Sequence, residues 1–116
     1  MALVHQSDKS ARDIYGVKIL NPKSGKTMRM YELLLNWVEE LRADAIIVGA
    51  TVPEVIKQYS ERLKDKVIIF SPGIDPQGGD VTQALANGSD FLIIGRSIQE
   101  AKEPEKEAAR FAKLTW

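Results

Sequence analysis

Short, unbroken runs of apolar residues, rich in Val and Ile, recur along this chain and predict its strands. We expect strands at residues 2–5, 45–48, 67–70 and 91–94, of which the first is the weakest run. Apolar residues follow one another there without alternation, which is typical of parallel sheets whose strands are covered on both faces.

Amphipathic segments lie between and after these runs. Apolar residues recur at spacings of three and four from 28 to 41, which predicts a helix. Further helices are expected at 53–63, 81–86 and 103–114, with a proline in the first turn of the first and last of these. Asp80 is placed to cap the short third helix, and Asn87-Gly88 to end it. Four strand–helix units in succession predict parallel strands with right-handed crossovers.

Residues 6–26 are the least regular part of the chain. A short helical turn is expected at 11–14 and a loop at 21–25, where Asn, Pro, Ser and Gly gather.

One segment of the chain is repeated. Residues 44–51 (DAIIVGAT) resemble residues 90–97 (DFLIIGRS) at a spacing of 46, which is two strand–helix units. In a (β/α)₈ barrel alternate strands share layers of the interior, so a repeat at every second strand fits barrel geometry. Simple similarity between buried strands is the alternative, and the repeat by itself leaves both open.

The amino-acid composition limits the classes of function that this chain could have. The 116 residues suit one domain, and the 16 basic and 16 acidic residues balance, whereas nucleic-acid binders usually carry a basic excess. No apolar run reaches about 18 residues, so no membrane span is expected. The absence of Cys excludes disulfides and thiolate metal sites, and no secretory signal is evident. A cytoplasmic protein is the simplest interpretation.

The loop at residues 71–80 (SPGIDPQGGD) carries the first candidate chemistry. It follows a predicted strand and precedes a predicted helix. Gly78 and Gly79 would let the backbone approach an anion at the start of that helix, and the Gln77 amide can donate without adding charge. The loop therefore predicts one wall of a phosphate pocket, although Gly78-Gly79 taken alone could be only a turn.

A second candidate follows the last predicted strand. Arg96 offers a planar fork that matches phosphate bidentately, and Gly95 lets the chain come close beside it. Loops after the seventh and eighth strands of a barrel often bind phosphate. Arg96 taken alone could be a surface ion-pair residue, but together the two strand ends favour phosphate binding.

These motifs resemble one known family. The run Ser71-Pro72-Gly73-Ile74, then Gln77-Gly78-Gly79-Asp80, and residues 90–98 look like the C-terminal end of archaeal-type orotidine 5′-monophosphate (OMP) decarboxylases. The resemblance is strong from 67 to 109. It implies a (β/α)₈ barrel that acts as a homodimer and converts OMP to UMP and CO₂ in pyrimidine biosynthesis, without metal or organic cofactor.

The resemblance also implies site residues. In the family the glutamine, here Gln77, closes over the substrate phosphate, and Ser7 corresponds to a serine that contacts the pyrimidine. The family's usual Ser-His-Pro is absent at that point, where His5-Gln6-Ser7 stands instead. The residues that the resemblance places at the phosphate are Pro72, Gly73, Gln77, Gly78, Gly79, Gly95 and Arg96.

The family's catalytic array is missing from this chain. Members are about twice as long and carry Asp-x-Lys-x-x-Asp after the third strand, whereas Lys64-Asp65-Lys66 here precedes its strand. We therefore expect residues 1–116 to form a single domain, a parallel (βα)₄ half-barrel equivalent to the C-terminal half. It should bind phosphate or a nucleotide monophosphate without turnover, and no catalytic residue is assigned.

Four strands leave two open edges and an incompletely covered apolar face. The chain is therefore expected to form a homo-oligomer or to join a complementing N-terminal half-barrel. Two alternative functions stay open, a non-catalytic half-barrel scaffold that oligomerises and a fragment of a hexulose-phosphate synthase or decarboxylase.

Overall fold

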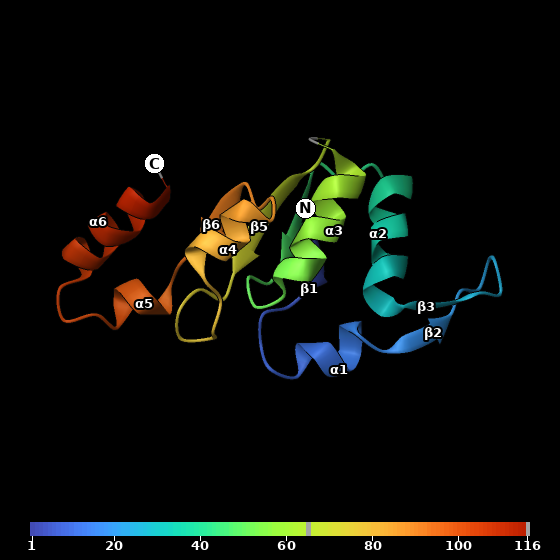
Figure 1. Cartoon of the computed structure of the whole chain (residues 1–116), viewed down its shortest axis with the longest axis horizontal. Coiled ribbons are helices and arrows are strands. Elements are labelled where there is room, and N and C mark those ends of the chain that lie inside the picture. The colour runs from blue at the N-terminus through green and yellow to red at the C-terminus, as the bar shows by residue number, and fades with distance from the viewer. Residues whose placement is uncertain (65, 116) are drawn as a thin grey trace.

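A four-stranded parallel sheet forms the centre of the computed structural model, which describes residues 1–64 and 66–115 (Figure 1). Asp65 of the Lys64-Asp65-Lys66 segment lies outside the described residues. The strands are β1 (Ala2–His5), β4 (Ala45–Val48), β5 (Ile68–Pro72) and β6 (Phe91–Ile93), in the order β1-β4-β5-β6. All three strand pairs are parallel, which confirms the predicted α/β class with successive strand–helix units.

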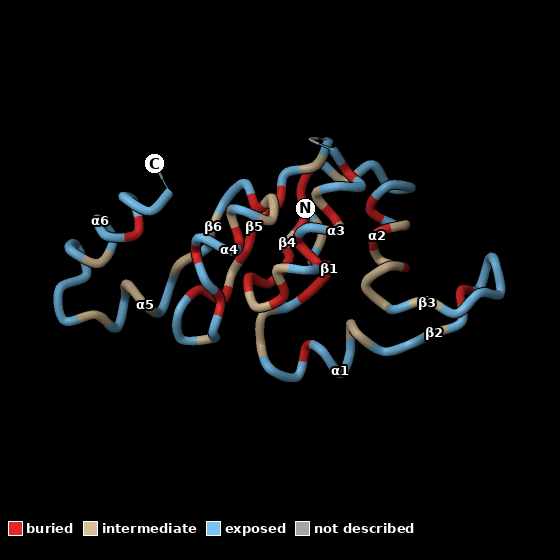
Figure 2. Tube along the Cα trace, in the orientation of Figure 1, coloured by how far each residue is buried: buried red, intermediate tan, exposed pale blue. Residues whose placement is uncertain are grey.

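Helices pack against one face of this sheet. They are α2 (Met30–Glu40), α3 (Pro53–Leu63) and the short α4 (Val81–Ala86), with α6 (Pro104–Thr115) beyond the edge strand β6 (Figure 1). Buried residues line the strands and the inward faces of α2 and α3 in Figure 2. The core members with no exposed surface include Leu35, Ile46, Ile56 and Tyr59. The Tyr59 hydroxyl donates to the Tyr31 carbonyl at 2.5 Å, which ties α3 to the first turn of α2.

In the part of the chain that the structure describes, the other face of the sheet is exposed to solvent. Leu3, Ile47, Phe70 and Phe91 are register partners across the sheet, so they share one face. Leu3 is 47% exposed and Phe91 52%, while Phe70 and Phe91 stack with their ring centroids 5.1 Å apart. The continuous apolar runs suggested that both faces would be covered, but one face is open in this chain by itself, as expected for a sheet of only four strands. In a closed barrel the second face would point into the interior.

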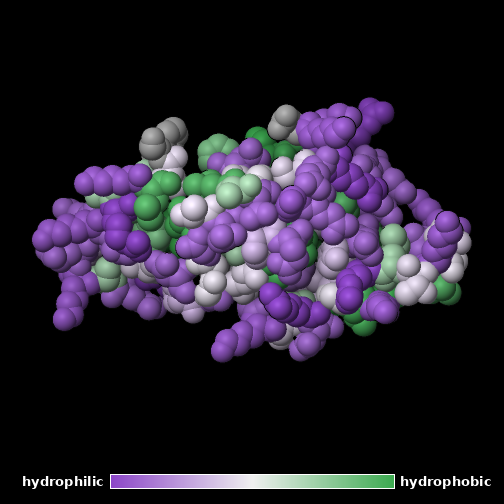
Figure 3. Space-filling view, in the orientation of Figure 1, coloured by the Kyte–Doolittle hydropathy of each residue, from purple (hydrophilic) through white to green (hydrophobic). Residues whose placement is uncertain are grey.

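An apolar hollow of about 440 Å³ also opens between α6 and the sheet edge. Leu85, Leu92, Ile94 and Phe111 contribute its apolar lining. Figure 3 shows apolar residues gathered at this place on a surface that is otherwise largely hydrophilic. The edge strand β6 is thus apolar on its open face and beside α6.

The irregular segment contains structure that the sequence did not reveal. The expected helical turn is α1 (Ala11–Tyr15), but it is followed by an antiparallel hairpin of β2 (Lys18–Leu20) and β3 (Thr27–Arg29). The expected loop at 21–25 is the turn of this hairpin. Because residues 28 and 29 pair with β2, α2 begins at Met30 instead of residue 28.

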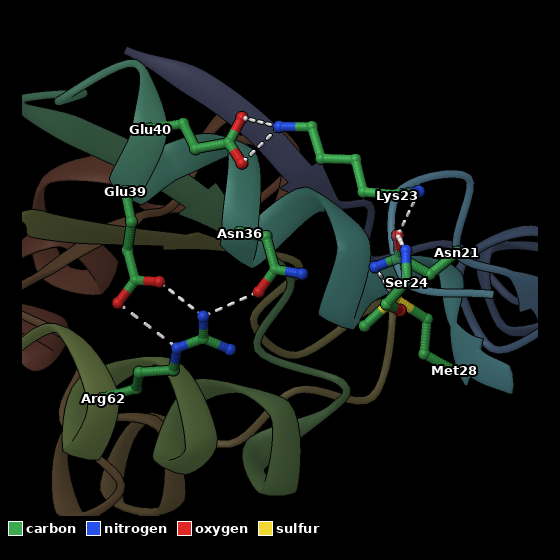
Figure 4. A network of polar contacts seen from close by, with 8 residues as sticks. All are labelled: Asn21, Lys23, Ser24, Met28, Asn36, Glu39, Glu40 and Arg62. Atoms are coloured by element: carbon green, nitrogen blue, oxygen red, sulfur yellow. Dashed lines mark hydrogen bonds and ion pairs between the residues drawn. The ribbon is translucent and has the colours of Figure 1, made fainter. Parts of the chain in front are cut away.

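Polar contacts hold the hairpin turn against α2 (Figure 4). The side-chain Oδ1 of Asn21 accepts from the backbone N–H groups of Lys23 and Ser24 at 2.8 and 3.1 Å. The Lys23 ammonium pairs with Glu40 at the end of α2 at 2.7 Å. Both side chains of this ion pair are more than half exposed, so it contributes about 0–1 kcal/mol and orients the hairpin more than it stabilises the fold.

Membrane-crossing helices are not found in the described part of the chain, since none of its helices combines the necessary length with an apolar composition.

Candidate functional site

The residues singled out in the sequence lie where the parallel strands end. Ser7 follows β1, the loop at 73–79 follows β5, and Gly95 and Arg96 follow β6. Because the carboxyl ends of parallel strands meet at one edge of a sheet, a single rim of the molecule holds all of them. The fold brings only some of these residues into contact.

Ser7 and Gln77 are in direct contact although 70 residues separate them. The Ser7 hydroxyl donates to Gln77 Oε1 at 2.9 Å. This leaves the two N–H bonds of the Gln77 amide for another acceptor. The family resemblance placed both residues at one ligand, and the structure shows them in contact with each other.

Gly73 makes this contact possible. Its φ of 92° is in the region that glycine favours, and a Cβ there would crowd the Ser7 Cβ and lie 2.8 Å from the Ser7 hydroxyl oxygen. The same Cβ would lie 3.1 Å from Gln77 Oε1. The absence of a Cβ at Gly73, the residue that follows β5, therefore leaves room for the Ser7–Gln77 pair.

The glycines after Gln77 serve the loop's own structure. The Gly78 N–H donates to the Asp75 carbonyl at 2.8 Å, and the Gly79 N–H to the Gly73 carbonyl at 2.9 Å. Both amides were expected to face a phosphate, but in this conformation they are used inside the loop. The Asp80 carboxylate accepts from the Gln83 N–H at 2.7 Å, which confirms its predicted capping role. The Gln77 side chain is therefore this loop's main candidate donor.

Arg96 opens a short helix that the sequence did not predict, α5 (Arg96–Gln99), directly after Gly95. Arg96 is exposed, and its guanidinium makes no hydrogen bond or ion pair with the side chains that the structure describes. The next residue, Ser97, donates through its hydroxyl to the Ile74 carbonyl at 3.5 Å. This contact brings the turn that carries Arg96 against the loop that carries Gln77.

A hollow of about 280 Å³ adjoins the Ser7–Gln77 pair, and its lining adds residues that the sequence did not single out. They include Lys9, Arg12 and Thr51, whose hydroxyl donates to the Ser7 carbonyl at 3.1 Å. Arg96 is not among the lining residues. The internal repeat contained a usable signal here, because Thr51 stands at the position equivalent to Ser97. Among the described residues no group of three or more His, Cys, Asp or Glu could hold a metal ion.

His5 lies beneath this rim and is 2% exposed. Its Nδ1 lies 2.7 Å from the Gln6 carbonyl oxygen, and its ring packs on Tyr15 with centroids 4.8 Å apart. Burial lowers the pKa of His5, against a smaller opposing effect of the Gln6 contact. The imidazole is therefore neutral in the folded chain near pH 7.

This burial predicts a pH dependence of stability. As the pH falls below the ordinary histidine pKa of about 6.5, the unfolded chain takes up a proton that the folded chain resists. The free energy of unfolding should then fall with decreasing pH, by at most about 1.4 kcal/mol per pH unit, until the lowered folded pKa is reached. Urea unfolding between pH 5 and 7.5 measures this. The His5→Gln variant should lack this part of the dependence, and identical pH profiles for both proteins would contradict the prediction.

Comparison with known proteins agrees with this fold. Residues 1–111 match the Orotidine 5'-phosphate decarboxylase / HUMPS family. The Orotidine 5'-phosphate decarboxylase of Pyrococcus abyssi is 40% identical over 94 residues, which are 81% of this chain and 41% of that protein. The chain spans about half the length of the curated relatives it matches.

Solved structures of the same family resemble this chain in fold. The crystal structure of orotidine 5'-phosphate decarboxylase from Pyrococcus horikoshii OT3 aligns with a TM-score of 0.71 and 27% identity, covering 97% of this chain and 49% of that one. The Methanocaldococcus jannaschii enzyme, solved in complex with the inhibitor BMP, aligns with a TM-score of 0.67 and 26% identity over 74% of this chain and 40% of that one.

Proposed function

The chain belongs to the Orotidine 5'-phosphate decarboxylase / HUMPS family, and on this premise we propose that it supplies the phosphate-binding half of an OMP decarboxylase. The complete enzyme would convert OMP to UMP and CO₂ in pyrimidine biosynthesis. One observation carries the proposal, the Ser7–Gln77 hydrogen bond over Gly73 on the rim where Arg96 also lies. A family relative solved with the inhibitor BMP supports a nucleotide monophosphate as the ligand class.

In this proposal Arg96 and Gln77 hold the phosphate from two sides. The guanidinium donates two parallel charged hydrogen bonds, and the Gln77 amide donates a neutral one. Ser7 keeps Gln77 Oε1 occupied at 2.9 Å, so the amide presents N–H groups, not its oxygen, to the anion. Pro72 and Gly73 lie beside the ligand, and Gly78 and Gly79 give the loop its shape. Gly95 lets the ligand approach the backbone beside Arg96.

The Ser7 hydroxyl would also contact the pyrimidine. Its bond to Gln77 joins the residue that touches the base to the residue that touches the phosphate. Binding energy from a remote phosphate can then orient the reacting end of a substrate, which is how non-reacting groups accelerate a reaction. This would be the contribution of the present chain to catalysis.

Decarboxylation itself needs a spaced array of side chains, Asp-x-Lys-x-x-Asp, that this sequence does not contain. A carboxylate beside the substrate carboxylate and an ammonium that stabilises the carbanion and delivers the proton are both required. We propose that a second (βα)₄ unit with the Asp-x-Lys-x-x-Asp array covers the open sheet face of Leu3, Ile47, Phe70 and Phe91. Residues 1–116 would then be one half-barrel domain of a closed barrel.

Complementation tests the proposal. The N-terminal half of the Pyrococcus abyssi relative is mixed with this chain, and decarboxylation is followed as the loss of orotidine absorbance. We expect turnover in the mixture and none with either half alone. A mixture that sedimentation shows to be folded and associated, but that is inactive, would contradict the proposal. UMP binding without turnover would then favour a half-barrel scaffold, and a stable monomer at micromolar concentration would contradict oligomerisation.

The hexulose-phosphate alternative is not favoured, since the relatives described above carry the decarboxylase name.

A further inference from the structure

The loop that carries Gln77 is joined to the last helix by one ion pair. Arg110 on α6 donates from Nη2 to the Asp75 Oδ2 at 2.9 Å, across 35 residues of sequence. We propose that Arg110 is a positioning residue, which fixes the Gln77 loop in its binding shape through Asp75. The loop geometry supports the positioning role itself, and its effect on ligand binding rests on the proposed function.

Asp75 is the residue on which the loop closes. Its N–H donates to the Gly79 carbonyl at 2.9 Å, and its own carbonyl accepts from the Gly78 N–H at 2.8 Å. These two bonds bracket Gln77 from both sides. Asp75 also has a φ of 57°, a left-handed conformation that is costly for a residue with a Cβ. An outside contact that holds Asp75 therefore holds the conformation of the whole turn.

Arg110 is itself held in place before it reaches the loop. Its Nε and Nη2 donate to the Glu107 Oε1 at 2.9 and 2.6 Å. The guanidinium also lies over the Phe111 ring, 4.2 Å from its centroid, and Phe111 is 3% exposed in the core. The guanidinium is thus oriented by a carboxylate and a buried ring, so its bond to Asp75 transmits the position of α6 to the loop.

Amide hydrogen exchange of the ligand-free chain tests this directly. The Arg110→Ala variant should exchange the Gly78 and Gly79 amides about two- to five-fold faster, the range for one half-exposed ion pair. The Asp75→Asn variant, which alters the same ion pair from the loop side, should speed exchange at Gly78 and Gly79 by a similar factor. The double variant should exchange no faster than either single variant. Lys106→Ala is the matched control, because it removes an ion pair of the same region, with Glu103, that does not touch the loop.

Two results of the exchange experiment would overturn the inference. One is unchanged exchange at Gly78 and Gly79 in Arg110→Ala. The other is equally faster exchange at the Ile69 amide, which donates to Asp90 in the sheet, since that would indicate a general loss of stability instead of a local release.

A ligand arm separates this inference from the proposed function. UMP affinity should fall by a similar factor in Arg110→Ala, and should fall no further when Arg110→Ala is added to Gln77→Ala, because Arg110 acts through Gln77. An additional loss in the Gln77→Ala background would contradict the positioning role. If the parent chain binds no UMP, the proposed function fails, while the exchange measurement still decides whether Arg110 holds the loop.

Discussion

Replacing Arg96 by alanine should weaken UMP binding by about 30-fold, which corresponds to about 2 kcal/mol for the loss of charged hydrogen bonds. Arg96 is exposed and makes no side-chain hydrogen bond or ion pair within the described residues, so its removal should leave the fold unchanged. The effect should therefore appear in affinity and not in stability. Isothermal titration of both proteins at one fixed salt concentration measures it.

Arg42→Ala is the matched control for this variant. Arg42 is equally an exposed arginine, but it lies between α2 and β4, at the opposite end of the strands. Its replacement removes the same charge from the chain and should leave UMP affinity within about two-fold, because an exposed charge that far away is screened by salt. Equal losses of UMP affinity in the two variants would mean that Arg96 contributes only its net charge. Unchanged UMP affinity in Arg96→Ala would refute a phosphate-binding role for Arg96.

Gly73→Ala should have the second large effect, on stability and binding together. Alanine at a φ of 92° is strained, and its Cβ would crowd Ser7 and Gln77. Backbone strain of about 1–2 kcal/mol and overpacking of about 1–3 kcal/mol together predict a loss of about 2–5 kcal/mol of unfolding free energy. The Ser7–Gln77 bond should break as well, with a corresponding loss of UMP affinity. Urea unfolding and titration of the same preparation measure both.

Gly78→Ala separates the two causes. Gly78 has nearly the same φ, 91°, but a Cβ there would meet nothing within 4 Å. It should therefore cost only the strain of about 1–2 kcal/mol and leave the Ser7–Gln77 contact intact. If Gly73→Ala and Gly78→Ala lose the same stability, crowding at Ser7 does not contribute and the packing role assigned to Gly73 is wrong.

The parallel sheet could be predicted because its signal is local. Runs such as 45–48 are apolar without interruption, and Asp80 caps its helix within three residues. The placement of the Gln77 loop and of Arg96 at strand ends was predictable for the same reason, since each follows an apolar run. Their convergence then follows from parallel topology alone. Ser7 was found only through the family resemblance.

Other features depend on contacts that no local pattern records. The β2–β3 hairpin consists of three-residue strands with exposed residues, so no clear hydrophobic period marked it. The direction of the Gly78 and Gly79 amides depends on the left-handed Asp75, and Asp75 in turn on Arg110, which lies 35 residues away. An incompletely covered apolar face was expected from the small number of strands. The apolar runs did not show that Leu3 and Phe91 would lie on it, because such runs look the same on a covered and on an open face.

Titrating the chain with UMP and with uridine tests the central claim most directly. The two ligands share base and ribose and differ only in the phosphate. If Gln77 and Arg96 form the phosphate end of a nucleotide site, UMP should bind at least about 30-fold more tightly than uridine, and inorganic phosphate should compete with it. Equal affinities for UMP and uridine, or no binding of UMP to the folded chain, would contradict the account.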